Sequence, residues 1–152
     1  MLIGNPLNSS ELAFPVLECI HILAFAFSVG TAAIVDLRLI GIGMTDQSPS
    51  DLWKDTSLWT LLGLIVVVFS GLLLFSSDPD NYYLNYAFLV KMACLLLAVV
   101  HNYTAVRKAA SGAATHANGR LVGSVALFFW ACVVFGGIFI GFLNSTLDSR
   151  RV

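Results

Sequence analysis

The longest stretch without a charged side chain is residues 121–147, LVGSVALFFWACVVFGGIFIGFLNSTL. A helix needs roughly 20 apolar residues to cross the hydrocarbon layer of a bilayer, and this stretch is long enough. Three more apolar stretches precede it, at about 14–43, 57–75 and 86–106. The sequence therefore predicts an all-α protein with four transmembrane helices.

The composition supports the same interpretation. The chain has 152 residues, of which 58% are hydrophobic and 11% charged, whereas soluble domains contain about 25% charged residues. A water-soluble fold of this size exposes too much surface to hide so many apolar side chains. We expect one integral membrane domain, residues 1–152, surrounded by lipid. A net charge of −1 offers no basic surface to nucleic acid.

The connections between the predicted helices are short and rich in turn-forming residues, at 46–50, 77–81 and 111–119. Short connections favour antiparallel neighbours, so we expect an up-down-up-down bundle. Lysine and arginine counts set the orientation of such a bundle. The side of the first and third loops carries Arg38, Lys54, Arg107, Lys108 and Arg120, against Lys91, Arg150 and Arg151 on the other side. This bias predicts both termini outside the cytoplasm.

Five charged or titratable residues within the predicted spans are the main candidates for function: Glu18, His21, Asp36, Lys91 and His101. Ionisable groups at membrane depth are costly and point to function by default. The competing interpretation of each histidine is a hydrogen bond between helices.

Neutral imidazole is a good ligand of haem iron, so His21 and His101 are candidate axial ligands of haem b. Counted from the predicted helix starts, they lie ~12 Å apart along the bundle at 1.5 Å per residue. Either helix tilt brings both to one iron, or there are two separate sites. In the second case Lys91 and Met92 would lie opposite His21, and His116 of the third loop could approach His101.

The other ionisable residues have supporting roles in this hypothesis. Glu18 lies three residues before His21, on the same helix face, and could orient its ring. Arg38 and Lys91 would neutralise the haem propionates, and Asp36 with Arg38 could position a propionate or a quinone. The alternative for Asp36 and Arg38 is an anchor at the membrane interface, with the arginine reaching toward water.

Short motifs resemble known families. The segment from His21 to Gly30, followed by Asp36-Leu-Arg38-Leu39, resembles the first helix of small bacterial four-helix membrane proteins of unassigned function. It is more distantly similar to the copper-resistance D domain and to HemJ-type protoporphyrinogen oxidases, and the similarity covers most of the chain. In HemJ proteins an early histidine, an Arg-Leu pair and a Lys-to-His stretch occupy the positions of His21, Arg38-Leu39 and Lys91 to His101.

This resemblance implies a small four-helix membrane protein that binds haem b. Together with the charge bias, it leads us to expect the bacterial inner membrane with periplasmic termini. HemJ proteins also have a proline before the Arg-Leu pair and an aromatic-His tail after it. Here Asp36-Leu37 precedes the pair and residues 40–43 are Ile-Gly-Ile-Gly, which puts porphyrinogen oxidation in doubt.

The leading functional hypothesis is a b-type haem protein that passes electrons between a quinone, or a redox partner, and the haem. One alternative is a HemJ-like porphyrinogen oxidase, and another is a cofactor-free accessory subunit of a larger membrane complex. If the chain is an enzyme, we expect an oxidoreductase. With so little mass outside the membrane, we expect it to work as a homo-oligomer or within a larger complex.

Overall fold

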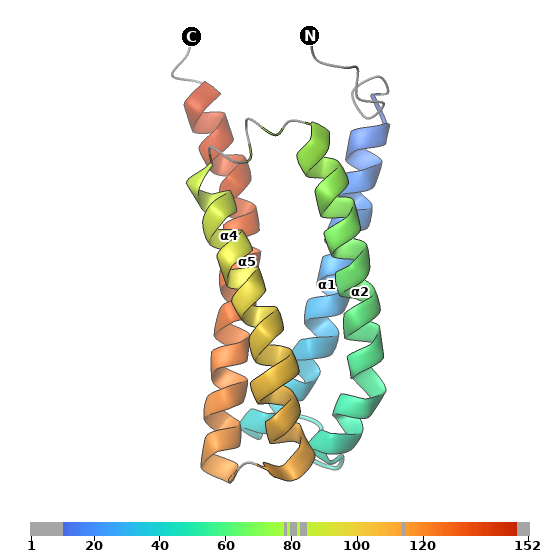
Figure 1. The fold of residues 1–152 in the computed structure, drawn as a ribbon, viewed down its shortest axis with the longest axis vertical. Coiled ribbons are helices and arrows are strands. Elements are labelled where there is room, and N and C mark those ends of the chain that lie inside the picture. The colour runs from blue at the N-terminus through green and yellow to red at the C-terminus, as the bar shows by residue number, and fades with distance from the viewer. Residues whose placement is uncertain (1–10, 78, 80–81, 83–84, 114, 149–152) are drawn as a thin grey trace.

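Four long helices pack as an antiparallel up-down bundle, as predicted (Figure 1). The computed structural model describes residues 11–77, 79, 82, 85–113 and 115–148, and only the backbone of 141–148. The long helices are α1 (Ala13–Ile40), α2 (Pro49–Ser77), α4 (Tyr86–His101) and α5 (His116–Asp148). Beyond α4 the chain continues through two π-helical segments, η2 (Asn102–Val106) and η3 (Ala109–Ala113). Most of the predicted turn at 77–81, together with Arg150 and Arg151, lies outside the described residues.

Helix α1 ends three residues earlier than predicted, because a glycine stops it. Gly41 adopts a left-handed conformation with φ 91°, which costs glycine no steric strain. The N–H of Ile42 donates to the carbonyl of Leu37 at 2.9 Å and that of Gly41 to the carbonyl of Arg38 at 3.1 Å, as in a Schellman motif. The predicted span continued to Gly43 because Ile42, which follows this stop, is apolar.

Helix α2 begins at Pro49, well before the predicted start at Ser57. Ser48 caps it, because its hydroxyl oxygen accepts the N–H of Asp51 at 3.1 Å. Proline suits the first helical position. The apolar stretch marks only the membrane-embedded part of this helix, whose first two turns are polar. In the same way α5 begins at His116 rather than Leu121, so His116 belongs to a helix and not to a loop.

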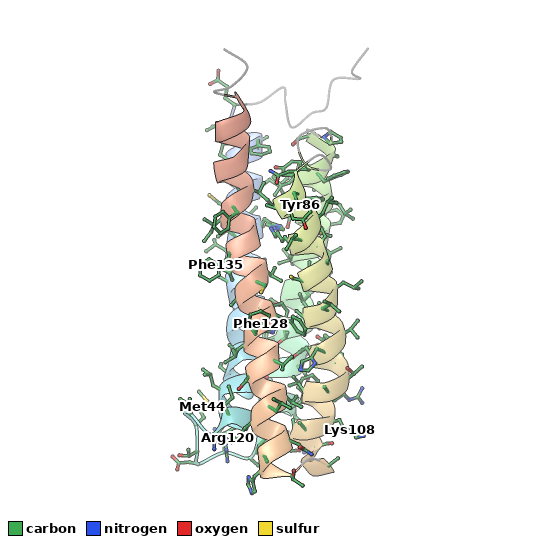
Figure 2. All side chains as sticks on the ribbon, turned by 90° about the vertical axis from the view of Figure 1, so that its left-hand side faces the viewer. Met44, Tyr86, Lys108, Arg120, Phe128 and Phe135 are labelled. Atoms are coloured by element: carbon green, nitrogen blue, oxygen red, sulfur yellow. The ribbon has the colours of Figure 1, made fainter. Side chains whose placement is uncertain are left out.

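Four segments are long and apolar enough to cross a bilayer: α1, α2, the run Tyr86–Ala113 formed by α4, η2 and η3, and His116–Ile140 of α5. Large hydrophobic side chains cover the outside of the bundle, and Phe128 and Phe135 project from it in Figure 2, with 64% and 60% of their surface exposed. Such a surface requires lipid around it. The chain is therefore a multi-pass membrane protein that associates with the lipid bilayer.

The bundle consists of two hairpins, α1 with α2 and α4 with α5, which meet mainly where α1 packs against α5. Helix α1 begins and α5 ends at one end of the bundle, here called the terminal end, and the opposite end is the loop end (Figure 1). Lys108 and Arg120 lie at the loop end (Figure 2).

Small and hydroxyl residues bring α1 close to α2. The hydroxyl of Ser28 donates to the carbonyl of Thr60 at 3.0 Å, and the hydroxyls of Thr31 and Thr60 are 2.8 Å apart. A Cβ on Gly63 would lie 2.8 Å from the Cβ of Ser28. Close packing through small residues and hydrogen bonds replaces the hydrophobic driving force that is missing inside a membrane.

Two apolar clusters form much of the buried core. The loop-end cluster contains Val35, Leu52, Val106, Ala110 and Ala126. The central cluster contains Ala32, Leu64, Ala98 and Trp130. The buried Asn102 lies between Ala98 and Val106, one residue of each cluster, and the buried Asp36 follows Val35 of the loop-end cluster.

Candidate functional site

The ring of His21 is hydrogen-bonded to α2. Its Nδ1 lies 2.8 Å from the hydroxyl oxygen of Ser70 in α2. That hydroxyl lies 2.6 Å from the carbonyl of Val66 and donates its proton there. In the tautomer that carries the proton on Nδ1, the Ser70 oxygen accepts this N–H and the Nε2 lone pair is available. The ring also hydrogen-bonds the backbone of Val67. A histidine that binds a metal through one nitrogen usually donates the other N–H in this way.

All four helices contribute to the level of His21. Gly71 of α2 packs against the imidazole, since a Cβ there would lie 3.2 Å from Cε1. Lys91 of α4 is within electrostatic range of the ring. Gly136 and Gly137 of α5 pack against Lys91. A Cβ on Gly136 would lie 3.0 Å from the Cβ of Lys91, and a Cβ on Gly137 would lie 3.5 Å from its Nζ. We call this set the His21 layer: His21, Ser70, Gly71, Lys91, Gly136 and Gly137.

The His21 layer contains basic groups without an acidic one. Within the part of the chain that the structure describes, Lys91 forms no ion pair and no hydrogen bond. Glu18, which was expected to orient His21, has an exposed side chain, and the group that holds the ring is Ser70. The layer could therefore accommodate an anionic group beside the ammonium of Lys91.

His101 is engaged differently. Its Nε2 lies 3.1 Å from the carbonyl oxygen of Val122 in α5. A carbonyl only accepts, so this nitrogen carries the proton. The ring also meets the edge of Phe129, with centroids 5.8 Å apart. His101 thus bridges α4 and α5, which was the alternative interpretation for a histidine in a span.

The two histidines lie at different depths. His21 is level with Lys91, and ten residues separate Lys91 from His101 along α4, which is about 15 Å at 1.5 Å per residue. This exceeds the expected ~12 Å. Because a metal–imidazole bond is only about 2 Å long, the two rings do not converge on one iron in this arrangement. Met92 is 45% exposed and His116 is exposed at the start of α5, so neither approaches a histidine ring from the interior.

Arg38 and Asp36 are not paired with each other. The guanidinium of Arg38 donates to the carbonyls of Gln47 at 2.7 Å and Thr45 at 3.4 Å, and so fastens the connection between α1 and α2. This agrees with the anchor interpretation. Asp36 is fully buried, and both of its carboxyl oxygens lack a partner in the described structure.

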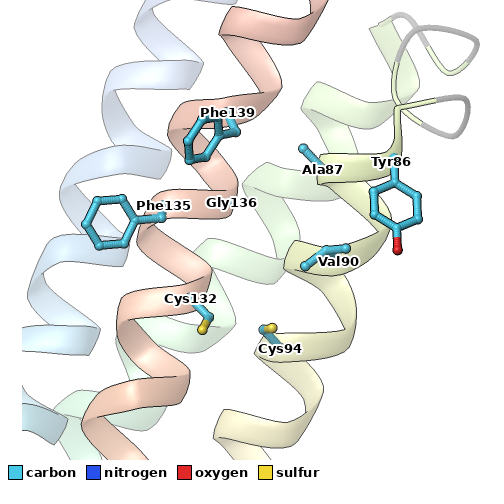
Figure 3. Close-up of a pocket in the computed structure, with 8 residues that line it drawn as sticks. All are labelled: Tyr86, Ala87, Val90, Cys94, Cys132, Phe135, Gly136 and Phe139. Atoms are coloured by element: carbon cyan, nitrogen blue, oxygen red, sulfur yellow. The ribbon is translucent and has the colours of Figure 1, made fainter.

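An apolar groove runs between α4 and α5 (Figure 3). Its volume is about 350 Å³, and it is lined by Tyr86, Ala87, Val90, Cys94, Cys132, Phe135, Gly136 and Phe139. Cys94 and Cys132 face each other across it (Figure 3), and both are free thiols.

We expect Cys94 and Cys132 to cross-link on mild oxidation in the membrane, because opposite thiols on adjacent helices need little movement to form a disulfide. Peptide mapping by mass spectrometry detects the bond. Cys19 lies on the exposed face of α1 and is the internal control. A Cys19 link to either thiol, in place of the Cys94–Cys132 bond, would contradict the register of α4 and α5.

Several buried polar residues were not predicted from the sequence. Asn102, Tyr103 and Trp130 each have a buried polar atom without a partner in the described structure. The only signal in the sequence was the position of Asn102 directly after His101. Among the described residues, no three His, Cys, Asp or Glu side chains gather as a metal site.

Comparison with known proteins gives one family. Neither the curated proteins nor the solved structures contain a match to the chain. Residues 12–143, which include α1, α2, α4 and most of α5, match the model of a protein family of unknown function, DUF6644. The chain therefore belongs to the DUF6644 family.

Proposed function

We propose that this chain is a membrane-embedded b-type haem protein that passes electrons between a quinone, or a redox partner, and the haem. His21 would be an axial ligand through Nε2. The observation that supports this proposal is the hydrogen bond between Nδ1 of His21 and the hydroxyl of Ser70, because a histidine that binds a metal through one nitrogen usually hydrogen-bonds through the other.

The glycines of the His21 layer support the proposal, because a flat macrocycle needs small residues where it meets a helix. In this arrangement the His21 ring and the Lys91 side chain fill the space beside Gly71, Gly136 and Gly137, so both would have to move to admit a porphyrin. The ammonium of Lys91, which has no anionic partner among the described residues, would neutralise a propionate. His101 would stabilise the bundle rather than bind the iron.

The groove between α4 and α5 suits the hydrocarbon tail of a quinone, because its lining is apolar and includes Gly136, which packs against Lys91. The basic residues Lys108 and Arg120 lie at the loop end, which supports an orientation with that end in the cytoplasm. We place the chain in a bacterial inner membrane with periplasmic termini, in a homo-oligomer or a larger complex.

The test is the visible spectrum of protein purified from cells supplied with a haem precursor. We expect a Soret band, and we expect a short-chain quinol to reduce the haem and sharpen the longer-wavelength bands. Protein without Soret absorbance would contradict the proposal and favour the cofactor-free accessory subunit. Haem that no quinol reduces would leave haem binding intact and point to a protein as the electron partner.

A further inference from the structure

Five buried polar atoms without partners in the described structure belong to four residues of one region. They are both carboxyl oxygens of Asp36, the Oδ1 of Asn102, the hydroxyl of Tyr103 and the Nε1 of Trp130. Asp36, Asn102 and Trp130 are at most 2% exposed. Buried polar atoms are almost always hydrogen-bonded, so a cluster of exceptions needs a physical explanation.

Contacts with α5 put Asp36 and Asn102 at the same depth. The carbonyl oxygen of Asp36 lies 2.6 Å from where a Cβ of Gly123 would be. His101, next to Asn102 in the chain, binds the carbonyl of the neighbouring residue Val122. Helix α1 and segment η2 are also in contact.

Trp130 and Tyr103 adjoin this level. Trp130 is seven residues beyond Gly123 along α5, about 10 Å toward the terminal end, and belongs to the central cluster with Ala32 and Ala98, against which Tyr103 packs. Ala32 precedes Asp36 by four residues, and Ala98 precedes Asn102 by four, which is about one helical turn or ~5.4 Å. We call Asp36, Asn102, Tyr103 and Trp130 the polar layer, which is roughly 12 Å deep.

The chemistry of the polar layer matches water better than a metal ion. The oxygens of Asp36 and Asn102 accept hydrogen bonds, the indole N–H of Trp130 donates one, and the hydroxyl of Tyr103 can do both. Water can serve all of them together, and a buried water typically makes two to four such bonds. A cation would leave the indole N–H unpaired. The π-helical segment η2 begins at Asn102, and π-helical turns often occur at functional sites.

We propose that the polar layer holds internal water and that the carboxyl group of Asp36 carries an exchangeable proton there. A lone ionised carboxylate is very costly in such surroundings, whereas a neutral carboxylic acid donates a hydrogen bond to water and keeps its proton. No described cation compensates Asp36: Arg38 binds the connecting loop, and His101 is held by Val122. Asp36 lies 15 residues from His21 along α1, which is about 22 Å, and its proton binding does not depend on haem.

The water is tested by X-ray hydroxyl-radical footprinting of the haem-free chain in lipid nanodiscs, since radicals form from water next to the side chain they label. We expect Tyr103 and Trp130 to be oxidised several-fold faster than Trp59, which is 53% exposed but faces lipid. Rates for Tyr103 and Trp130 no higher than for Trp59 would overturn the internal water. This comparison needs no variant.

The proton is tested by infrared spectroscopy of the same sample. We expect a carboxylic acid C=O band at neutral pH that shifts in heavy water, disappears in Asp36→Asn and persists in Asp51→Asn, whose side chain is exposed at the start of α2. A spectrum without a band that depends on Asp36 would overturn the proton site. Because both measurements use haem-free protein, their outcome is separate from that of the haem proposal.

Discussion

Replacing His21 with alanine should abolish the Soret band of haem-supplied protein, whereas His101→Ala should retain it. His21 lies beside Lys91 and the glycines of the His21 layer, whereas the His101 ring donates its Nε2–H to Val122 and packs against Phe129. His101→Ala removes only a bridge between α4 and α5, and we expect a loss of stability on the order of 1 kcal/mol. Absorbance per mole of purified, folded protein measures the difference.

Ser70→Ala should weaken haem binding without abolishing it. It keeps the imidazole of His21 but removes the oxygen that holds its Nδ1–H. Loss of such a partner typically weakens metal binding roughly 10- to 100-fold, so we expect haem to bind but to dissociate more readily. A full Soret band in His21→Ala together with its loss in His101→Ala would reverse the assignment of the ligand.

Gly123→Ala should destabilise the bundle strongly, although it adds only one methyl group. The added Cβ would lie 2.6 Å from the backbone carbonyl oxygen of Asp36, and backbone cannot swing away as a flexible side chain does. Overpacking of this kind typically costs about 1–3 kcal/mol. The substitution also pushes apart α1 and α5, the main contact between the two hairpins.

Gly30→Ala is the matched control, because nothing lies within 4 Å of the Cβ position at Gly30. Alanine is the better helix former by about 1 kcal/mol, so this variant should be as stable as the parent or slightly more so. Thermal unfolding in one detergent, followed by circular dichroism, compares the two. Equal unfolding temperatures for Gly123→Ala and Gly30→Ala would contradict the close approach of α1 to α5.

The four spans could be predicted because lipid imposes a simple requirement on sequence. Long uncharged stretches such as 121–147 must be helical to satisfy their backbone groups in the bilayer. The ends of the helices were harder to predict, since they depend on local hydrogen bonds and turns that hydropathy does not report. Gly41 stops α1 through a left-handed turn, and Ser48 starts α2 in polar sequence.

The candidate site was only partly predictable. His21 and Lys91 stood out because ionisable groups are rare at membrane depth, but the partner of His21 is Ser70, 49 residues away. Glu18 shares a helix face with His21 by spacing, yet its side chain is exposed. Asn102 and Trp130 are inconspicuous in the sequence. Only the packing of α1, η2 and α5 reveals that their polar atoms are buried without partners in the described structure.

The central claim is that Nε2 of His21 is the nitrogen that binds haem iron. Resonance Raman spectroscopy of the reduced, haem-loaded protein addresses this bond itself. We predict an iron–histidine stretching band that shifts when histidine is labelled with nitrogen-15 and is missing from His21→Ala. A band that persists in His21→Ala, or a band that does not shift when histidine is labelled with nitrogen-15, would contradict the account.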